Sequence, residues 1–128
     1  VVMTQDTGVI RSVTTAAPKG GALPYRSIDV GVTGLVAKAT PGKLISIHAH
    51  NINAATRYLK IYNKATAPTE SDTPKMTIPL PTGNSTFFLG DAGVDFSAGI
   101  SIRATTGLAD NDTGAPTASQ TIVNLVVC

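Results

Sequence analysis

The chain has 128 residues, a formal net charge of +2 at pH 7 and only 14% charged residues. This length suits one domain of roughly 100–150 residues, and the low charge, spread without a basic cluster, argues against a nucleic-acid partner. No apolar stretch approaches the roughly 20 residues that cross a bilayer, so we expect no membrane partner. The single cysteine, Cys128, cannot form an internal disulfide or build a zinc site by itself.

The composition favours a β protein that is secreted or assembled with other chains. Hydrophobic residues make up 42% of the chain, but aromatic residues make up only 5% and tryptophan is absent. The core must therefore consist mainly of Val, Ile, Leu and Ala. A surface with so little charge must be covered by Thr, Ser, Asn and Gly, or be buried against other chains.

Residues 1–22 are predicted to form an extended N-terminal arm, followed by a β-sandwich domain over residues 23–128. Residues 9–15, VIRSVTT, are the strand candidate in this arm. Pro18 and the glycines at positions 20 and 21 then interrupt regular structure. In a protein that acts alone such a segment is a disordered tail, whereas in an assembly it is an arm that lies on another molecule.

Short stretches of β-branched and apolar residues recur along the rest of the chain, separated by turns rich in Gly, Pro and Asn. They predict strands at residues 25–30, 35–39, 43–50, 57–63, 75–81, 85–89, 94–97, 100–106 and 120–127. The prolines in 75–81 cannot donate to a ladder, so that strand must lie at a sheet edge or be short. The last strand is apolar on both faces, which indicates a central position or cover on both sides.

About seven to nine short strands without helical periodicity predict an all-β fold, an antiparallel β-sandwich. A jelly-roll-like topology is preferred to an immunoglobulin-like one, because the chain lacks a cysteine pair and a core tryptophan.

The runs at residues 43–50 and 57–63 are predicted to form an antiparallel hairpin at the centre of the fold. Ile45 and Ile47 share one face of the first run, and Leu59 and Ile61 share one face of the second. We expect these aliphatic side chains to hold the sandwich core, because a hairpin needs a second layer to bury its apolar face.

The opposite face of the second run carries Tyr58, Lys60, Tyr62 and Lys64, and Arg57 lies at its start. Exposed aromatic rings beside cations are typical of contact surfaces, so these residues are candidates for an interface with another chain. The alternative is that the tyrosines cap a second small core and keep their hydroxyl groups in water.

His48 and His50 lie two residues apart in the first run, so their rings share a face, a geometry that metal sites use. A third and a fourth ligand are not identifiable in the sequence. We therefore place both histidines with the candidate interface and predict no metal site there.

The loop at residues 110–114, DNDTG, alternates oxygen-bearing side chains and ends in a glycine, as calcium loops do. It lacks the later bidentate glutamate of an EF-hand. An Asx-type turn at Asp110 or Asp112 is therefore the preferred interpretation, with calcium as the alternative. We expect no metal and no cofactor.

No catalytic constellation is visible in the chain. It contains no Gly-x-Ser-x-Gly elbow, no His-Glu-x-x-His motif, no phosphate-binding glycine loop and no Cys/His pair. Asp91 and Asp95 lie near a glycine turn, but such pairs occur by chance in β proteins. We expect that the protein is not an enzyme.

Residues 56–68, TRYLKIYNKATAP, with TP at 73–74, TIPLP at 77–81 and ATTGLADND at 104–112, resemble small virion proteins of tailed bacteriophages. RYLKIYNK followed by TIPLP is the most specific part of a resemblance that extends over residues 30–127. It implies a β-sandwich that decorates or cements the capsid, binds the major capsid protein and assembles as a homotrimer. The candidate interface residues would then contact another subunit or the capsid, and no catalytic residues are implied.

On this interpretation the protein is located in the virion, on the outer capsid surface, where it stabilises contacts between capsomers. A tail or fibre subunit that binds a host surface glycan is the alternative. A secreted hydrolase is a third class, and the missing acid, base or nucleophile counts against it.

Overall fold

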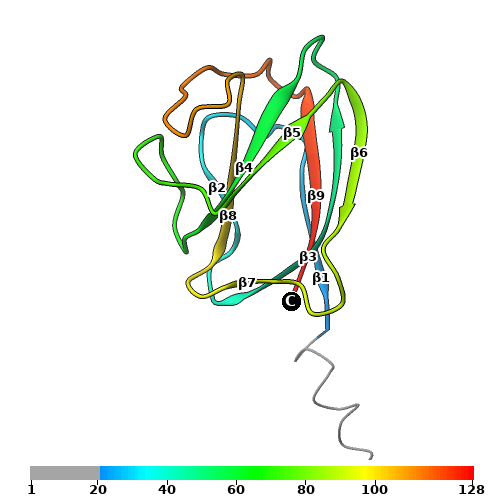
Figure 1. The fold of residues 1–128 in the computed structure, drawn as a ribbon, viewed down its shortest axis with the longest axis vertical. Helices are drawn as coiled ribbons and strands as arrows, with labels where there is room; N and C mark the ends of the chain where they lie inside the picture. Colours follow the sequence, from blue (N-terminus) through cyan, green and yellow to red (C-terminus); the bar gives the residue numbers. More distant parts are fainter. Residues whose placement is uncertain (1–20) are drawn as a thin grey trace, which may run out of the picture.

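The computed structural model describes residues 21–128 and shows an all-β protein whose nine strands form two antiparallel sheets (Figure 1). The strand expected at residues 9–15 and most of the expected arm lie outside the described residues. The strands are β1 (Leu23–Ser27), β2 (Leu35–Lys38), β3 (Gly42–Asn51), β4 (Arg57–Asn63), β5 (Met76–Leu80), β6 (Gly83–Phe88), β7 (Val94–Phe96), β8 (Ile100–Thr105) and β9 (Thr121–Val127). Within this part of the chain there is no helix that could cross a membrane.

The two sheets have the topology of a jelly roll. The five-stranded sheet has the order β1-β9-β3-β6, with β7 also paired to β3, and the four-stranded sheet has the order β2-β8-β4-β5. The pairs β1–β9, β2–β8, β3–β6 and β4–β5 therefore fall alternately in the two sheets, as when one long antiparallel ribbon is rolled up. The structure confirms the predicted sandwich and the preference for jelly-roll topology.

The core lies between the sheets and consists mainly of branched aliphatic side chains. Its buried members on the strands are Leu44, Ile47, Ala49, Leu59, Ile61, Ile78, Leu80, Phe96, Ile100, Ile102, Ala104, Val123, Leu125 and Val127. Full burial of one such large side chain stabilises the fold by roughly 1.5–3 kcal/mol. Phe96 is the one phenylalanine in this buried set, as the aromatic-poor composition requires.

The predicted hairpin of residues 43–50 and 57–63 is wrong, because β3 and β4 lie in different sheets. Side-chain amides hold the crossing between them. Asn51, at the end of β3, donates to the carbonyl of Leu80 on β5 at 2.8 Å, and Asn53 donates to the hydroxyl of Thr121 on β9 at 3.2 Å. The apolar faces of β3 and β4 therefore meet across the core instead of lying side by side in one sheet.

The core face of β3 also begins one residue earlier than expected. Leu44 pairs with Val127 and Ser46 pairs with Val126, so Ile45 is an extra residue at a β-bulge. The bulge shifts the alternation, and Leu44 and Ile47 are both fully buried. Ile45, which we expected in the core, is only half-buried.

Two expectations about single strands are confirmed. The strand with prolines, β5, lies at an edge of the four-stranded sheet, and β9 lies between β1 and β3. The two phenylalanines of β6 separate, since Phe87 packs against the core and Phe88 is 67% exposed.

Candidate functional site

The outer face of the four-stranded sheet is covered. Its residues on β4 and β8 are buried although most are polar or charged: Lys60, Tyr62, Ser101, Arg103 and Thr105. Figure 1 shows the segment between β8 and β9, in orange, on the side of the molecule where β2, β4 and β8 lie. We call this segment, residues 106–120, the covering loop. The face beneath it is a second, polar interior.

Arg103 holds two loops against this face by hydrogen bonds. Its Nε donates to the carbonyl of Val32 at 2.9 Å, and its Nη2 donates to the carbonyl of Asp112 at 3.1 Å. Its Nη1 donates to the hydroxyl of Tyr62 at 3.0 Å. The guanidinium therefore joins β8 to the loop after β1, to β4 and to the loop that precedes β9.

Lys60 lies directly opposite Arg103 in the ladder between β4 and β8. Its Nζ donates to the carbonyl of Ala109. Removal from water lowers the pKa of Lys60, and the positive charge of Arg103 lowers it further, whereas Asp112 and Asp110 act in the opposite direction. Lys60 and Arg103 therefore hold carbonyl groups of the covering loop by hydrogen bonds, which is a structural role.

Two members of the predicted interface are inside the protein. Lys60 is 0% exposed and Tyr62 is 1% exposed, so the expectation of an exposed stripe is wrong for both. The loop between β8 and β9 covers both residues. The alternative kept the tyrosine hydroxyl groups in water, whereas the hydroxyl of Tyr62 accepts a hydrogen bond from Arg103 inside the protein. Tyr58 and Arg57 are half-buried, and their contact with another chain stays a prediction.

Lys64 lies beyond the covered face and forms an ion pair with Asp72. The distance from Nζ to the carboxylate oxygen is 2.7 Å, and both side chains are partly exposed. The hydrogen bond from Lys64, together with one from the backbone of Thr69, lowers the pKa of Asp72. A small polar hollow lies beside this pair, lined also by Asn63, Thr73 and Lys75. An interface role of Lys64 stays a prediction.

The loop at residues 110–114 forms an Asx-type turn. Asp112 accepts a hydrogen bond from the backbone of Gly114 at 2.7 Å through its own carboxylate. Gly107 and Gly114 both lie so close to Asp112 that a Cβ at either position would collide with its carboxylate. Across residues 21–128 no three His, Cys, Asp or Glu side chains gather in a way that could hold a metal ion.

The outer face of the five-stranded sheet is open within the described part of the chain. Strand pairing places its outward residues in cross-strand rows. One row contains Arg26, Asn124, His48 and Thr86, a second contains Ile122, His50 and Asn84, and a third contains Pro24, Val126, Ser46 and Phe88. Arg26 is the one charged residue in these rows. We call this surface the open face.

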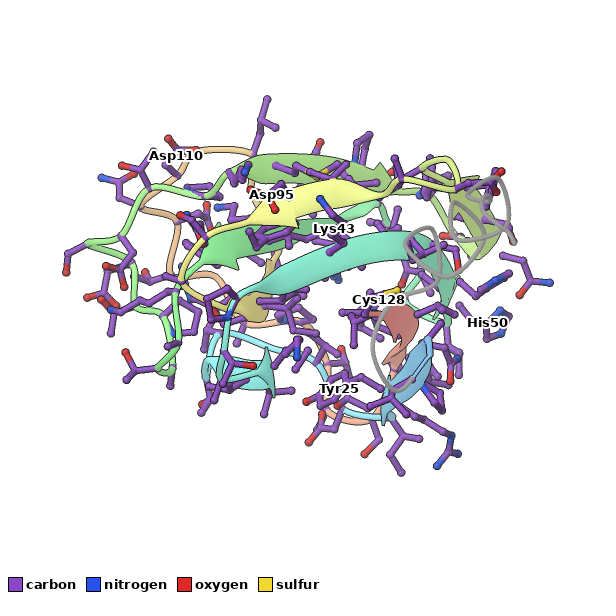
Figure 2. The ribbon with its side chains drawn as sticks, turned by 90° about the horizontal axis from the view of Figure 1, so that it is seen from below. Tyr25, Lys43, His50, Asp95, Asp110 and Cys128 are labelled. Carbon is purple, nitrogen blue, oxygen red and sulfur yellow. The ribbon has the colours of Figure 1, made fainter. Side chains whose placement is uncertain are left out.

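His48 and His50 line a shallow depression on the open face, together with Asn84, Thr86 and Asn124. The Nδ1 of His50 lies 2.5 Å from the amide oxygen of Asn84, to which it donates. Figure 2 shows His50 projecting away from the body of the protein, on the opposite side from Asp110. The depression thus offers imidazole and amide groups for hydrogen bonds to another molecule.

Lys43 and Asp95 form an exposed ion pair between β3 and β7, at 3.3 Å (Figure 2). Such a surface pair contributes about 1 kcal/mol or less. The pair links β3 to the short strand β7 and adds no net charge to the open face.

Both histidines, which the sequence grouped with the candidate interface, lie on the exposed side of β3. Their neighbours Asn84, Asn124 and Phe88 could not be predicted, because strand order cannot be read from alternation. Arg103 was not predicted either, and its signal in the sequence is a lone charge inside an otherwise uncharged strand. Comparisons of the chain with known protein families, with curated proteins and with solved structures found no match.

Proposed function

We propose that this protein is a structural subunit of a virion, a cement or decoration protein on the outer capsid surface. It binds the major capsid protein, as the expected homotrimer, and stabilises contacts between capsomers. The observation that carries this proposal is the open face: a broad sheet surface with Arg26 as the one charge in its rows. Such faces on monomeric proteins are usually covered or charged, and uncovered ones mark contact sites.

The open face has the chemistry of a contact surface. Phe88 is 67% exposed, and Ser46 separates it from Val126 in the same row, so this row supplies an aromatic anchor and an aliphatic side chain. The row of His48 and Asn124 supplies directed hydrogen bonds around it. Because few charges are present, docking costs little desolvation of ions.

The opposite face suits a subunit that bears load. Arg103 and Lys60 hold the loops over the four-stranded sheet by hydrogen bonds. The side of the sandwich opposite the contact surface is therefore well ordered. A cement protein works mechanically, by many modest contacts that hold neighbouring capsomers against internal pressure. No reaction chemistry is required of it.

The segments that resemble phage virion proteins lie on the covered side of the molecule. Residues 56–68 include β4, residues 77–81 include most of β5, and residues 104–112 run from β8 into the covering loop. The resemblance therefore concerns the scaffold, and the argument for docking rests on the open face.

A tail or fibre subunit that binds a host glycan is the second candidate. The observation that favours it is the depression with His50, Asn84 and Asn124, whose imidazole and amide groups suit sugar hydroxyls. A stacking ring is expected in such a site, and Phe88 lies two rows from Asn84 on the same strand.

The test uses particles of the encoding phage that lack this protein. We expect wild-type protein to bind the heads in a fixed stoichiometry and to delay DNA release on heating. Asn124→Arg, at the centre of the open face, should weaken binding at least about tenfold. Leu108→Asp is the control, because Leu108 is 61% exposed but lies in the covering loop.

Absence of binding to heads, or equal binding by Asn124→Arg and wild type, would overturn the proposal. Binding of the isolated protein to host cells, competed by soluble glycan, would favour the tail or fibre function instead. These outcomes separate the two candidates with one set of purified proteins.

A further inference from the structure

Five strands lie at the edges of the two sheets, and four of them carry features that hinder pairing with another strand. β7 has only three residues and contains Asp95. β1 contains Pro24 and Arg26, and β5 contains Pro79. β2 has only four residues and an irregular register between Val36 and Lys38. Prolines, charges, bulges and short length are the usual protections of sheet edges.

β6 has none of these protections. It is six residues long, GNSTFF, without a proline or a charge. Its register with β3 is unbroken from the pair of Ser46 and Phe88 to the pair of Asn51 and Gly83. Among the described strands none pairs with its other side. A regular, neutral strand with a free edge is a template for strand addition.

The free backbone groups of β6 can be assigned. The amide of Leu89, just after the strand, donates to the carbonyl of Ile45 at 2.8 Å. Backbone groups alternate along an antiparallel strand, so those of Asn84, Thr86 and Phe88 point away from β3. These three residues present a row of donors and acceptors to an incoming strand.

We propose that residues 9–15 of a neighbouring copy add to the free edge of β6 and extend the five-stranded sheet. The occupant is a second copy of this chain, and the contact is an exchanged arm. This inference concerns assembly of the protein with itself and does not depend on binding to a capsid.

The sequence of residues 9–15, VIRSVTT, suits this position. It is rich in β-branched residues, contains no proline, glycine or acid, and carries one charge at Arg11. Alternation would place Val9 and Val13 on one face and Ile10 on the other. Either phase of such a strand would present an apolar side chain to each face of the sheet, the core face of Phe87 and the outer face of the exposed Phe88.

A neighbouring copy fits better than the same copy. β1 and β6 are at opposite edges of their sheet, so a strand from the same copy would have to reach across about four strand spacings, roughly 19 Å. Residues 16–22, which separate residues 9–15 from β1, span at most about 25 Å when fully extended, so a strand from the same copy would need most of this reach. An arm from another copy is free of this constraint, and a closed ring of copies would fill every β6 edge.

The first test measures the mass of the full-length protein by light scattering after size exclusion. Wild type should form a species of at least two chains of 13.1 kDa. Thr86→Pro removes an amide that faces the free edge and leaves the ladder with β3 intact, so it should give the mass of one chain. Thr86→Val keeps the amide and should assemble like wild type.

A variant in the arm covers the case in which Thr86→Pro fails to fold. Val13→Pro changes none of the described strands and should also give single chains, with the circular-dichroism spectrum of a folded β protein. A wild type that is a single chain, or assembly that survives both proline variants, would overturn the proposal.

The second test distinguishes neighbouring from same-copy pairing. Ser12→Cys and Thr86→Cys are placed on separate chains that also carry Cys128→Ser, and the chains are mixed and treated with a short bismaleimide. A cross-linked species of two chains is expected. Cross-linking of the Ser12→Cys, Thr86→Cys double variant only within one chain would contradict the exchange. No particles are needed, so this outcome leaves the proposed capsid binding untouched.

Discussion

Arg103 donates to acceptors in three different segments: Val32 before β2, Tyr62 on β4 and Asp112 in the loop before β9. All three acceptors are neutral oxygens, so the guanidinium acts as a fixed fork of donors. A buried carbonyl that loses its donor costs about 1–3 kcal/mol. The residue should therefore contribute more to stability than its single position suggests.

Replacement of Arg103 by methionine should lower the free energy of unfolding by about 3 kcal/mol, because two carbonyls and a hydroxyl lose their donor inside the protein. Urea denaturation followed by circular dichroism measures this change. The matched control is Arg26→Met on the exposed β1, which should cost below about 0.5 kcal/mol. Equal urea midpoints for the two variants would show that Arg103 does not hold these segments together.

Asp72 makes part of the stability dependent on pH. Its pKa is lowered from 3.8 by hydrogen bonds from Lys64 and the backbone of Thr69. The folded state therefore holds the proton less tightly than the unfolded state, and the contribution is present above pH 3.8 and lost as the pH falls below it. Since the pair is partly exposed, the effect is small and screened by salt.

Unfolding free energies of wild type and Asp72→Asn, measured from pH 6 to pH 2.5 at low salt, should show this loss. Wild type should be the more stable at pH 6, and the difference should shrink at the acid end. A difference that stays constant over this range would show that Asp72 acts without its charge.

The bulge in β3 decides which side chains of this element reach the core. Because Ile45 is the extra residue opposite β9, Leu44 occupies the core position that simple alternation assigns to Ile45. This shift could not be predicted, since Leu44 and Ile45 are both aliphatic and either phase of the strand presents an apolar face.

Leu44→Ala and Ile45→Ala are therefore a matched pair. Leu44→Ala should cost about 3 kcal/mol, because it leaves a cavity in the packed core. Ile45→Ala should cost about 1 kcal/mol, because the side chain is half-buried. Thermal and urea unfolding of both variants measures the difference, and a reversed order would place the bulge elsewhere.

The strands themselves were predictable because turns rich in Gly, Pro and Asn interrupt period-2 runs. The edge position of β5 was one of the two options that Pro79 allowed, since proline has no amide hydrogen to donate to a ladder. The partner of a strand was not predictable in the same way. An apolar face such as that of Leu59 and Ile61 is satisfied equally by a neighbour in the sheet and by a strand across the core.

The candidate interface shows the same limit. Alternation correctly grouped Tyr58, Lys60 and Tyr62 on one face of β4. The loop that covers this face comes from residues about fifty positions away in the sequence, so its position could not be predicted. Nothing in the local sequence distinguishes a covered polar face from an exposed one. By contrast, the exposed histidines of β3 keep the position that the sequence assigned to them.

At the scale of the whole molecule, the two sheets have different tasks. The four-stranded sheet carries buried Lys60 and Arg103 under its loops, which makes that side a firm support. The five-stranded sheet presents the open face, ending at β6 with its free edge. An added strand at β6 would widen this face and bring Phe88 from its margin towards its middle.

We propose above all that the protein acts by docking the open face onto another protein of the virion. A cryo-electron reconstruction of phage particles that carry the protein tests it most directly. The account predicts density on the head in which β9, β3 and β6 face the capsid, with His50 and Phe88 at the contact. Density on the tail, or a contact made through the loop of Leu108 and Asp110, would contradict it.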